Sequence, residues 1–223
     1  MLRFDHVTVQ ENGHRILDDA SFEIFEGEKV AFYGKSGSGK TSILTTMVGA
    51  YIPTAGTICF RGEPLGAGTI QHIRQQVSYI GQEPVLGADR VLDAILLPFT
   101  FRANKAQAAP GRQVLAGMLQ QLHLDPAILE KQTAVISGGE KQRLAIAREL
   151  LLQKQIFIVD EITTGLDPHS KAAVLDFFRT SSCTLISVSH DPEWLKLCAR
   201  FFRVESGRIV EGAGRPEFEY ISM

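Results

Sequence analysis

Residues 29–41, KVAFYGKSGSGKT, join a short apolar run to a glycine-rich loop, and this stretch decides the fold. The run KVAFYG is typical of a strand buried in a parallel sheet. The segment after the loop, SILTTMVGA, predicts a helix that ends near Gly49. The loop matches G-x-x-x-x-G-K-[ST] between a strand and a helix, the context in which backbone N–H groups bind phosphate. The sequence therefore predicts an α/β protein with a phosphate site at its first helix.

The loop predicts binding of nucleotide phosphates with Mg²⁺. Its glycines let backbone N–H groups curl around phosphate oxygens, Lys40 supplies positive charge to the β and γ phosphates, and Thr41 offers a hydroxyl to Mg²⁺. The predicted nucleotide-binding residues are Gly34, Lys35, Ser36, Gly37, Ser38, Gly39, Lys40, Thr41 and Ser42. The alternative is a plain surface loop, which the flanking strand and helix disfavour.

Two later apolar runs end in side chains that suit nucleotide chemistry. QIFIVDE (155–161) ends in Asp160 and Glu161, and TLISVSH (184–190) ends in His190. Ligands bind at the carboxyl ends of strands in parallel α/β sheets. Asp160 is therefore expected to hold hydrated Mg²⁺, and Glu161 to orient or deprotonate the attacking water. The pair alone is a weak signal, since it also fits an exposed strand end, but after a phosphate loop it favours hydrolysis.

A second anion site is predicted at ISGGEKQRLAIAREL (136–150), a small polar turn that opens a helix. The free N–H groups at a helix start carry partial positive charge, and small residues allow close approach. Ser137 as a simple helix cap is the alternative.

The rest of the chain has a β-rich start, a helical middle and an alternating end. Strands are predicted at RFDHVTV (3–9), GTICFRG (56–62) and QQVSYIGQ (75–82), and ASFEIFEGEKV (20–30) predicts a strand, a Glu-Gly turn and the start of another strand. From about residue 83 to residue 135, helical periodicity such as that of QVLAGMLQQLHL predicts an inserted helical subdomain. AAVLDFF (172–178) and PEWLKLCARF (192–201) predict helices, and FFRVESGRIVEG (201–212) predicts a hairpin turning at Ser206-Gly207.

Composition bounds the function. The 223 residues suit one domain, and a net charge of −2 gives no footprint for nucleic acid. Three cysteines without a paired motif indicate a reducing compartment. The chain opens without an apolar signal region, and its longest apolar run, VLDAILLPFTF (91–101), is too short to span a bilayer. We therefore expect a cytoplasmic protein that works at a membrane only by docking on another protein.

Six motifs follow one another in a fixed order: the phosphate loop, Gly81-Gln82, SGGE (137–140), IVDE (158–161), Leu166-Asp167 and SVSH (187–190). In this order they resemble the ATP-binding cassette (ABC) ATPases over essentially the whole chain. The resemblance implies a P-loop NTPase fold with a parallel-sheet core and an N-terminal antiparallel β-subdomain. It also implies a helical subdomain at 83–153, inserted within a single domain of residues 1–223.

The resemblance also implies residue roles. Two copies would meet head to tail, so that the SGGE turn of one covers the ATP held by Lys40 of the other. Gln82 would contact Mg²⁺ or water, and His190 the γ-phosphate. The implied catalytic residues are Glu161, His190 and Gln82, and the implied Mg²⁺ ligands are Thr41, Gln82 and Asp160. The residues implied to act across the dimer are Ser137, Gly138, Gly139, Glu140 and Asp167. The alternative for Gln82 is a polar residue at the end of a strand. The alternative for Asp167 is a helix cap before Pro168.

Three positions depart from the family pattern. Glu140 replaces a glutamine, Ile162 replaces a proline, and Glu11 stands where an aromatic ring usually stacks on adenine. Among Phe, Tyr and Trp, none lies between Phe4 and Phe22. The hypothesis that follows is weaker or less base-selective nucleotide binding.

The resemblance implies a transporter subunit on the cytoplasmic face of the inner membrane, paired with a separate membrane permease. RQQVSYIGQEPVLGADRVLDAILLPF (74–99), SGGEKQR and VDEITTGLD are similar to the bacterial iron-export type, which suggests iron or metal export. The region after Gln82 would line the permease groove, with Leu96, Leu97, Phe99 and Phe101 as candidates or as plain core residues. The alternative functions are a soluble regulatory or nucleic-acid-associated ATPase, or a cassette that binds ATP without hydrolysing it.

Overall fold

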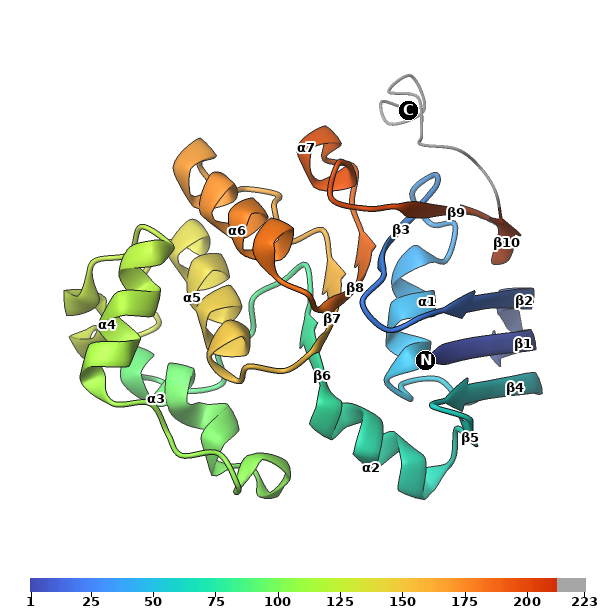
Figure 1. Ribbon diagram of the computed structural model, residues 1–223, viewed down its shortest axis with the longest axis horizontal. Helices are drawn as coiled ribbons and strands as arrows, with labels where there is room; N and C mark the ends of the chain where they lie inside the picture. Colours follow the sequence, from blue (N-terminus) through green and yellow to red (C-terminus); the bar gives the residue numbers. More distant parts are fainter. Residues whose placement is uncertain (212–223) are drawn as a thin grey trace.

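The computed structural model describes residues 1–211, which form two β-sheets and a set of helices (Figure 1). One sheet has six strands in the order β10-β9-β3-β8-β7-β6, and the other has four in the order β2-β1-β4-β5. Residues 212–223 lie outside the described part, as do the end of the predicted hairpin at Gly212 and the last part of the predicted domain. Within residues 1–211, no helix has the length and apolar character needed to cross a bilayer.

The six-stranded sheet has the predicted parallel core. Its strands are β3 (Lys29–Tyr33), β6 (Val77–Ile80), β7 (Ile156–Asp160), β8 (Thr184–Val188), β9 (Arg200–Glu205) and β10 (Arg208–Glu211). Pairing is parallel from β6 to β9, and only β9 and β10 run antiparallel. Every residue of β7 and β8 is buried, as expected for strands covered on both faces. The final hairpin turns at Ser206 and Gly207, whose φ angles are 48° and 80°, as predicted.

The four-stranded sheet is antiparallel and comes from the start of the chain. Its strands are β1 (Leu2–Glu11), β2 (His14–Ile24), β4 (Ala55–Phe60) and β5 (Glu63–Pro64). Phe22 of β2 stacks on Phe4 with ring centroids 4.5 Å apart, and it also meets Phe32 of β3 at 5.3 Å. The two sheets therefore share one aromatic core, which fixes β2 beside the strand that leads into the phosphate loop.

The helices cover the parallel sheet and extend away from the antiparallel one. They are α1 (Lys40–Met47), α2 (Ala67–Gln76), α3 (Val91–Leu96), α4 (Arg112–Gln121), α5 (Gly138–Leu151), α6 (Pro168–Thr180) and α7 (Pro192–Leu195), with 3₁₀ turns at Leu97–Thr100, Arg102–Asn104 and Pro126–Glu130. In Figure 1, α3 and α4 lie at the end of the molecule opposite the antiparallel sheet, and α5 lies between α4 and the parallel strands. Segment 83–153 thus holds α3, α4 and α5 and no strand of either sheet.

Two elements differ from the sequence prediction. The helix predicted at 192–201 ends at Leu195, because the backbone beyond it joins the sheet: the Ala199 N–H donates to Lys29 O at 2.8 Å, and Arg200 pairs with Val30. Helix α2 was not predicted, because it buries only Ile73 and its apolar periodicity is correspondingly weak.

Candidate active site

The phosphate loop lies between β3 and α1 and is wedged against backbone from both sheets. A Cβ atom on Gly34, whose φ is 150°, would lie 2.3 Å from Val204 O of β9. A Cβ on Gly39, whose φ is 103°, would lie 3.1 Å from Ile16 O of β2. Both positions therefore require glycine for packing and for their positive φ angles, in addition to any contact with phosphate.

Two polar groups of the loop fit a bound phosphate. Lys40 is buried, and its Nζ donates to Gly34 O and Lys35 O, each at 2.9 Å. Burial lowers the Lys40 pKa, whereas the nearby carboxylates of Glu161 and Asp160 raise it. Among residues 1–211, the Ser38 hydroxyl is buried without a hydrogen-bond partner. Such an orphaned donor at a glycine-rich loop is explained by an anionic ligand that would accept its bond.

Asp160, the last residue of β7, lies beside the start of α1. The Thr41 hydroxyl donates to Asp160 Oδ2 at 2.7 Å, and Asp160 is only 3% exposed. Burial raises the Asp160 pKa, and the bond from Thr41 lowers it. Hydroxyl and carboxylate oxygens are the ligands that Mg²⁺ prefers, with phosphate and water completing its shell. The two residues therefore fit the predicted Mg²⁺ site.

Glu161 and His190 lie at the ends of neighbouring strands, β7 and β8. His190 Nε2 is 3.5 Å from Glu161 Oε1, and burial lowers the His190 pKa. A lowered pKa keeps the imidazole neutral at neutral pH, so it can share a proton with the carboxylate or a ligand. Glu161 has a φ of 50°, and its N–H donates to Val188 O at 2.9 Å. A left-handed backbone costs a non-glycine residue about 1–2 kcal/mol, and such strain clusters at functional sites.

Gln82 follows β6, whose last residue Ile80 pairs with Val159, so it leaves the sheet beside the Asp160 strand. Gln82 is exposed, and its contact with Mg²⁺ or water stays a prediction. Downstream, Arg148 of α5 donates to Val85 O and Leu86 O at 3.1 and 3.2 Å. Sequence reasoning missed Arg148, which ties the segment after Gln82 to the helix that the SGGE turn opens.

The SGGE turn is a complete capping box. The Glu140 N–H donates to Ser137 Oγ at 3.2 Å, and the Ser137 N–H donates to Glu140 Oε2 at 2.7 Å. This reciprocal cap gives the Glu140 departure a structural reason, and the bond from the Ser137 N–H lowers the Glu140 pKa. Ser137 is thus the helix cap that the alternative interpretation predicted. A Cβ on Gly138 would meet nothing within 4 Å in the described residues, so α5 itself does not require that glycine.

Asp167 is the cap of α6, as its alternative predicted. Its Oδ1 accepts bonds from the His169 and Ser170 N–H groups, and its Oδ2 is 2.6 Å from Arg143 Nη1. Bonds from the Ser170 hydroxyl and N–H, with Arg143 nearby, bring the Asp167 pKa to about 2. Arg143 belongs to α5, so this ion pair, which sequence reasoning also missed, joins the SGGE helix to α6. The role of Asp167 across a dimer stays a prediction.

The candidate residues therefore fall into two groups. Lys40, Thr41, Asp160, Glu161 and His190 gather around the phosphate loop. Ser137 to Glu140 and Asp167 gather at the starts of α5 and α6. Within residues 1–211, no hydrogen bond or ion pair joins the second group to the first. The two anion sites of one chain thus remain separate.

Comparison with known proteins gives a consistent assignment. Residues 17–164 match the family described as ABC transporter. The chain is 32% identical over 197 residues to the "Probable iron export ATP-binding protein FetA" of Escherichia coli strain K12, covering 86% of each chain. It is 29% identical to the lactococcin-A transport/processing ATP-binding protein LcnC of Lactococcus lactis, covering 89% of this chain and 28% of that longer protein.

A solved structure confirms the predicted fold class. The ATP-binding cassette MJ0796, in a dimeric post-hydrolysis state bound to ADP and Pi, aligns with a TM-score of 0.82 and 25% identity. The alignment covers 94% of this chain and 96% of that one. The chain therefore belongs to the ABC transporter family, as an ATP-binding cassette ATPase.

Proposed function

We propose that the chain hydrolyses ATP at the edge where the phosphate loop meets the ends of β7 and β8. The observation that carries this proposal is the pair of contacts at this edge, Thr41 to Asp160 at 2.7 Å and Glu161 to His190 at 3.5 Å. Bound Mg²⁺ supplies neutralisation of phosphate charge, and Thr41 and Asp160, with Gln82, would hold it.

Each catalytic side chain then has one task. Lys40 leaves the two loop carbonyls and donates to the β and γ phosphates, because charge-assisted bonds to phosphate are stronger than bonds to neutral carbonyls. Glu161 orients the attacking water and accepts its proton. Neutral His190 has one N–H, which in this structure points at the Glu161 carboxylate 3.5 Å away and which donates to the γ-phosphate when ATP is bound. When a ligand binds Gln82, the backbone that follows it moves. Arg148, which donates to Val85 O and Leu86 O, passes that movement to α5.

A second copy of the chain is proposed to complete each ATP site. The SGGE turn and the phosphate loop of one chain do not contact each other, and Gly138 is open to solvent without any need for glycine in its own helix. A small residue that its own fold does not require suits close approach by another molecule. The head-to-tail homodimer is further supported by the dimeric state named for the MJ0796 cassette.

Enlarging Gly138 tests this composite site. Gly138→Gln is expected to keep the fold, because a Cβ there meets nothing, and to keep ATP binding at the phosphate loop. Its ATPase rate should fall about 10²-fold or more, because the added side chain keeps the N–H groups of α5 from the phosphate. Gly68→Gln, at the equally open start of α2, is the matched control and should hydrolyse ATP normally. A Gly138→Gln variant with the wild-type rate would contradict the composite site.

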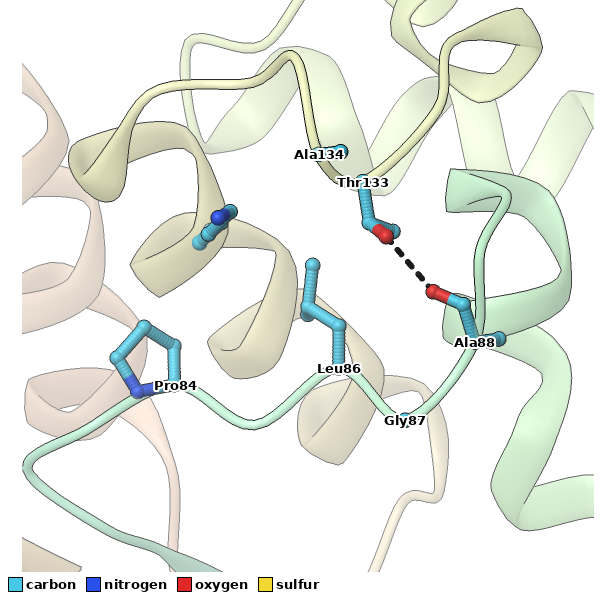
Figure 2. A pocket seen from close by; sticks show the side chains of 7 residues that line it. Pro84, Leu86, Gly87, Ala88, Thr133 and Ala134 are labelled. Atoms are coloured by element: carbon cyan, nitrogen blue, oxygen red, sulfur yellow. Dashed lines mark hydrogen bonds between the residues drawn. The ribbon is translucent and has the colours of Figure 1, made fainter.

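A membrane permease is proposed to dock on the face beside the segment that follows Gln82. A pocket of about 230 Å³ lies there. Figure 2 shows its lining residues, two of which are joined by a hydrogen bond from the Thr133 hydroxyl to Ala88 O at 2.8 Å. The lining residues are Pro84, Leu86, Gly87, Ala88, Thr133, Ala134 and Lys141. Val85 and Val135, which adjoin these segments, are 73% and 70% exposed. Exposed apolar side chains around a pocket, next to the segment that follows Gln82, are suited to bind an apolar helix of a partner.

The four apolar candidates from the sequence differ in their placement. Leu96 and Phe99 pack against the core, so they support the plain core interpretation. Leu97 is partly buried and lies against Gly87, where an added Cβ would come within 2.9 Å of it. Phe101 is 51% exposed and remains a candidate for contact with the permease.

Photo-crosslinking from position 135 distinguishes transport from the soluble alternatives. With a photoreactive residue at Val135, label in native membranes is expected on an integral membrane protein. The same probe at exposed Ile52, in the segment between α1 and β4, is the control and should give no such label. Label only on soluble proteins would favour the regulatory or nucleic-acid-associated alternative.

The exported substrate is proposed to be iron or another metal ion. This part of the proposal rests on the name of the Escherichia coli relative at 32% identity and on the VDEITTGLD stretch (159–167). The substrate path would lie in the permease, so the crosslinked membrane protein is also the chain in which to test metal selectivity.

A further inference from the structure

Two exposed histidines from distant segments face each other on the helical side of the molecule. His123 follows α4, and His169 is the second residue of α6. Their ring centroids are 5.7 Å apart, with the ring planes tilted by 54°. We propose that this histidine pair, His123 and His169, binds a single divalent transition-metal ion such as Zn²⁺. This site is separate from the proposed ATP chemistry and does not depend on it.

The spacing of the rings suits a shared ion. An imidazole nitrogen binds Zn²⁺ at about 2.0–2.1 Å, and two imidazoles on one ion at near-tetrahedral angles have ring centroids roughly 5–6 Å apart. The observed 5.7 Å therefore lets both rings bind one ion after small side-chain rotations. Without an ion, a contact between the two rings would stabilise the fold less, since both side chains are exposed to water.

The backbone beneath the pair is fixed. The His169 N–H donates to Asp167 Oδ1 at 3.1 Å, and the His123 N–H donates to Gln120 O at 3.0 Å. His123 has a φ of 54° at the position after the α4 cap, where glycine is usual. A histidine at a position that favours glycine has a strained backbone, and here it places its imidazole next to His169 of α6. The backbone of both histidines is thus held in place, and only the two side chains need to rotate when an ion binds.

The surrounding charge and the number of ligands define the class of ion. Asp167 lies two residues before His169, and its Oδ2 is 2.6 Å from Arg143 Nη1, so these two neighbouring charges balance each other. Residues 1–211 contain no group of three or more His, Cys, Asp or Glu that could hold a metal, so water must complete this shell. Imidazole ligands suit Zn²⁺, Ni²⁺ and Cu²⁺ and discriminate against Mg²⁺ and Ca²⁺. A bound ion would clamp the end of α4 to the start of α6.

Equilibrium dialysis of the nucleotide-free, untagged chain against Zn²⁺ tests the site. The wild-type chain and the His72→Ala control, which removes an exposed histidine of α2, should bind equal amounts of Zn²⁺. His123→Ala and His169→Ala should each lose one bound ion, with affinity at that site falling at least about tenfold. The double variant should also lose one ion and not two, because both ligands serve the same ion.

A second measurement separates binding from misfolding. Zn²⁺ should raise the thermal midpoint of the wild-type chain and of His72→Ala, because a ligand that binds the folded state stabilises it. The two pair variants should unfold near the wild-type midpoint without Zn²⁺ and gain less from its addition. Unchanged Zn²⁺ binding in either single variant, or the loss of two ions in the double variant, would overturn the proposal.

Discussion

Glu161→Gln is expected to stop steady ATP turnover while leaving ATP bound. The amide cannot accept a proton from the attacking water, and general-base assistance of this kind is worth about 10²–10⁴-fold in rate. Binding should persist, because Lys40, Thr41 and the loop backbone remain in place. Since hydrolysis reopens the proposed dimer, this variant should run as a monomer alone and as a dimer with ATP on size exclusion.

Two further variants sharpen that test. Glu63→Gln, an exposed carboxyl on β5, should hydrolyse ATP at the wild-type rate. Adding Gly138→Gln to Glu161→Gln should give a chain that binds ATP and remains a monomer, because the SGGE turn can no longer approach the phosphate. Turnover by Glu161→Gln near the wild-type rate would remove Glu161 as the catalytic base. Dimer formation by the double variant would place the dimer contact elsewhere.

Local patterns predicted the candidate site at the phosphate loop and the ends of β7 and β8, because each of its parts is a short continuous stretch of sequence. The loop, the run that ends in Asp160 and the run that ends in His190 each combine a buried strand with a polar end. Parallel pairing then places these ends at one edge, so their proximity follows from the fold class. The Ser206-Gly207 turn was predictable for the same reason, since two adjacent residues determine it.

Long-range contacts were not predictable from local patterns. The helix predicted at 192–201 included Arg200 and Phe201, yet their pairing with β3 places them in a strand. Arg143 and Arg148 look like ordinary charged residues of a helix, and only the folded chain shows them joined to Asp167 and to the Val85 carbonyl. The histidine pair was not predictable either, because 45 residues of sequence lie between His123 and His169.

The adenine hypothesis stays a prediction after the fold is known. Glu11 is exposed at the end of β1 and pairs with His14 across the tip of the first hairpin. Ile16 of the same hairpin packs its backbone on Gly39, so the hairpin does border the phosphate loop. A carboxylate at this border offers no ring face for stacking. Weak base selectivity remains the expectation for nucleotide binding.

Lys40→Ala is expected to remove productive ATP binding. The ammonium is the one charged side chain of the loop that is buried against it, and a hydrogen bond to a charged group is worth about 1.5–3 kcal/mol. Affinity should therefore fall about tenfold to a hundredfold, with a larger loss of turnover because charge grows on the γ-phosphate during transfer. Lys40→Arg should rescue little, since a planar guanidinium does not fit the space of a compact ammonium.

A control variant and a double variant with Glu161→Gln test whether the effect of Lys40→Ala is specific to phosphate binding. Lys105→Ala removes an exposed lysine of the helical segment and should bind ATP normally in a fluorescent-nucleotide titration. Lys40→Ala should unfold near the wild-type midpoint, which separates lost binding from lost structure. Adding Lys40→Ala to Glu161→Gln should abolish the ATP-dependent dimer, because closure requires a phosphate held by one copy and covered by the other. Wild-type affinity in Lys40→Ala would instead mean that the glycine-rich loop does not hold the nucleotide phosphates.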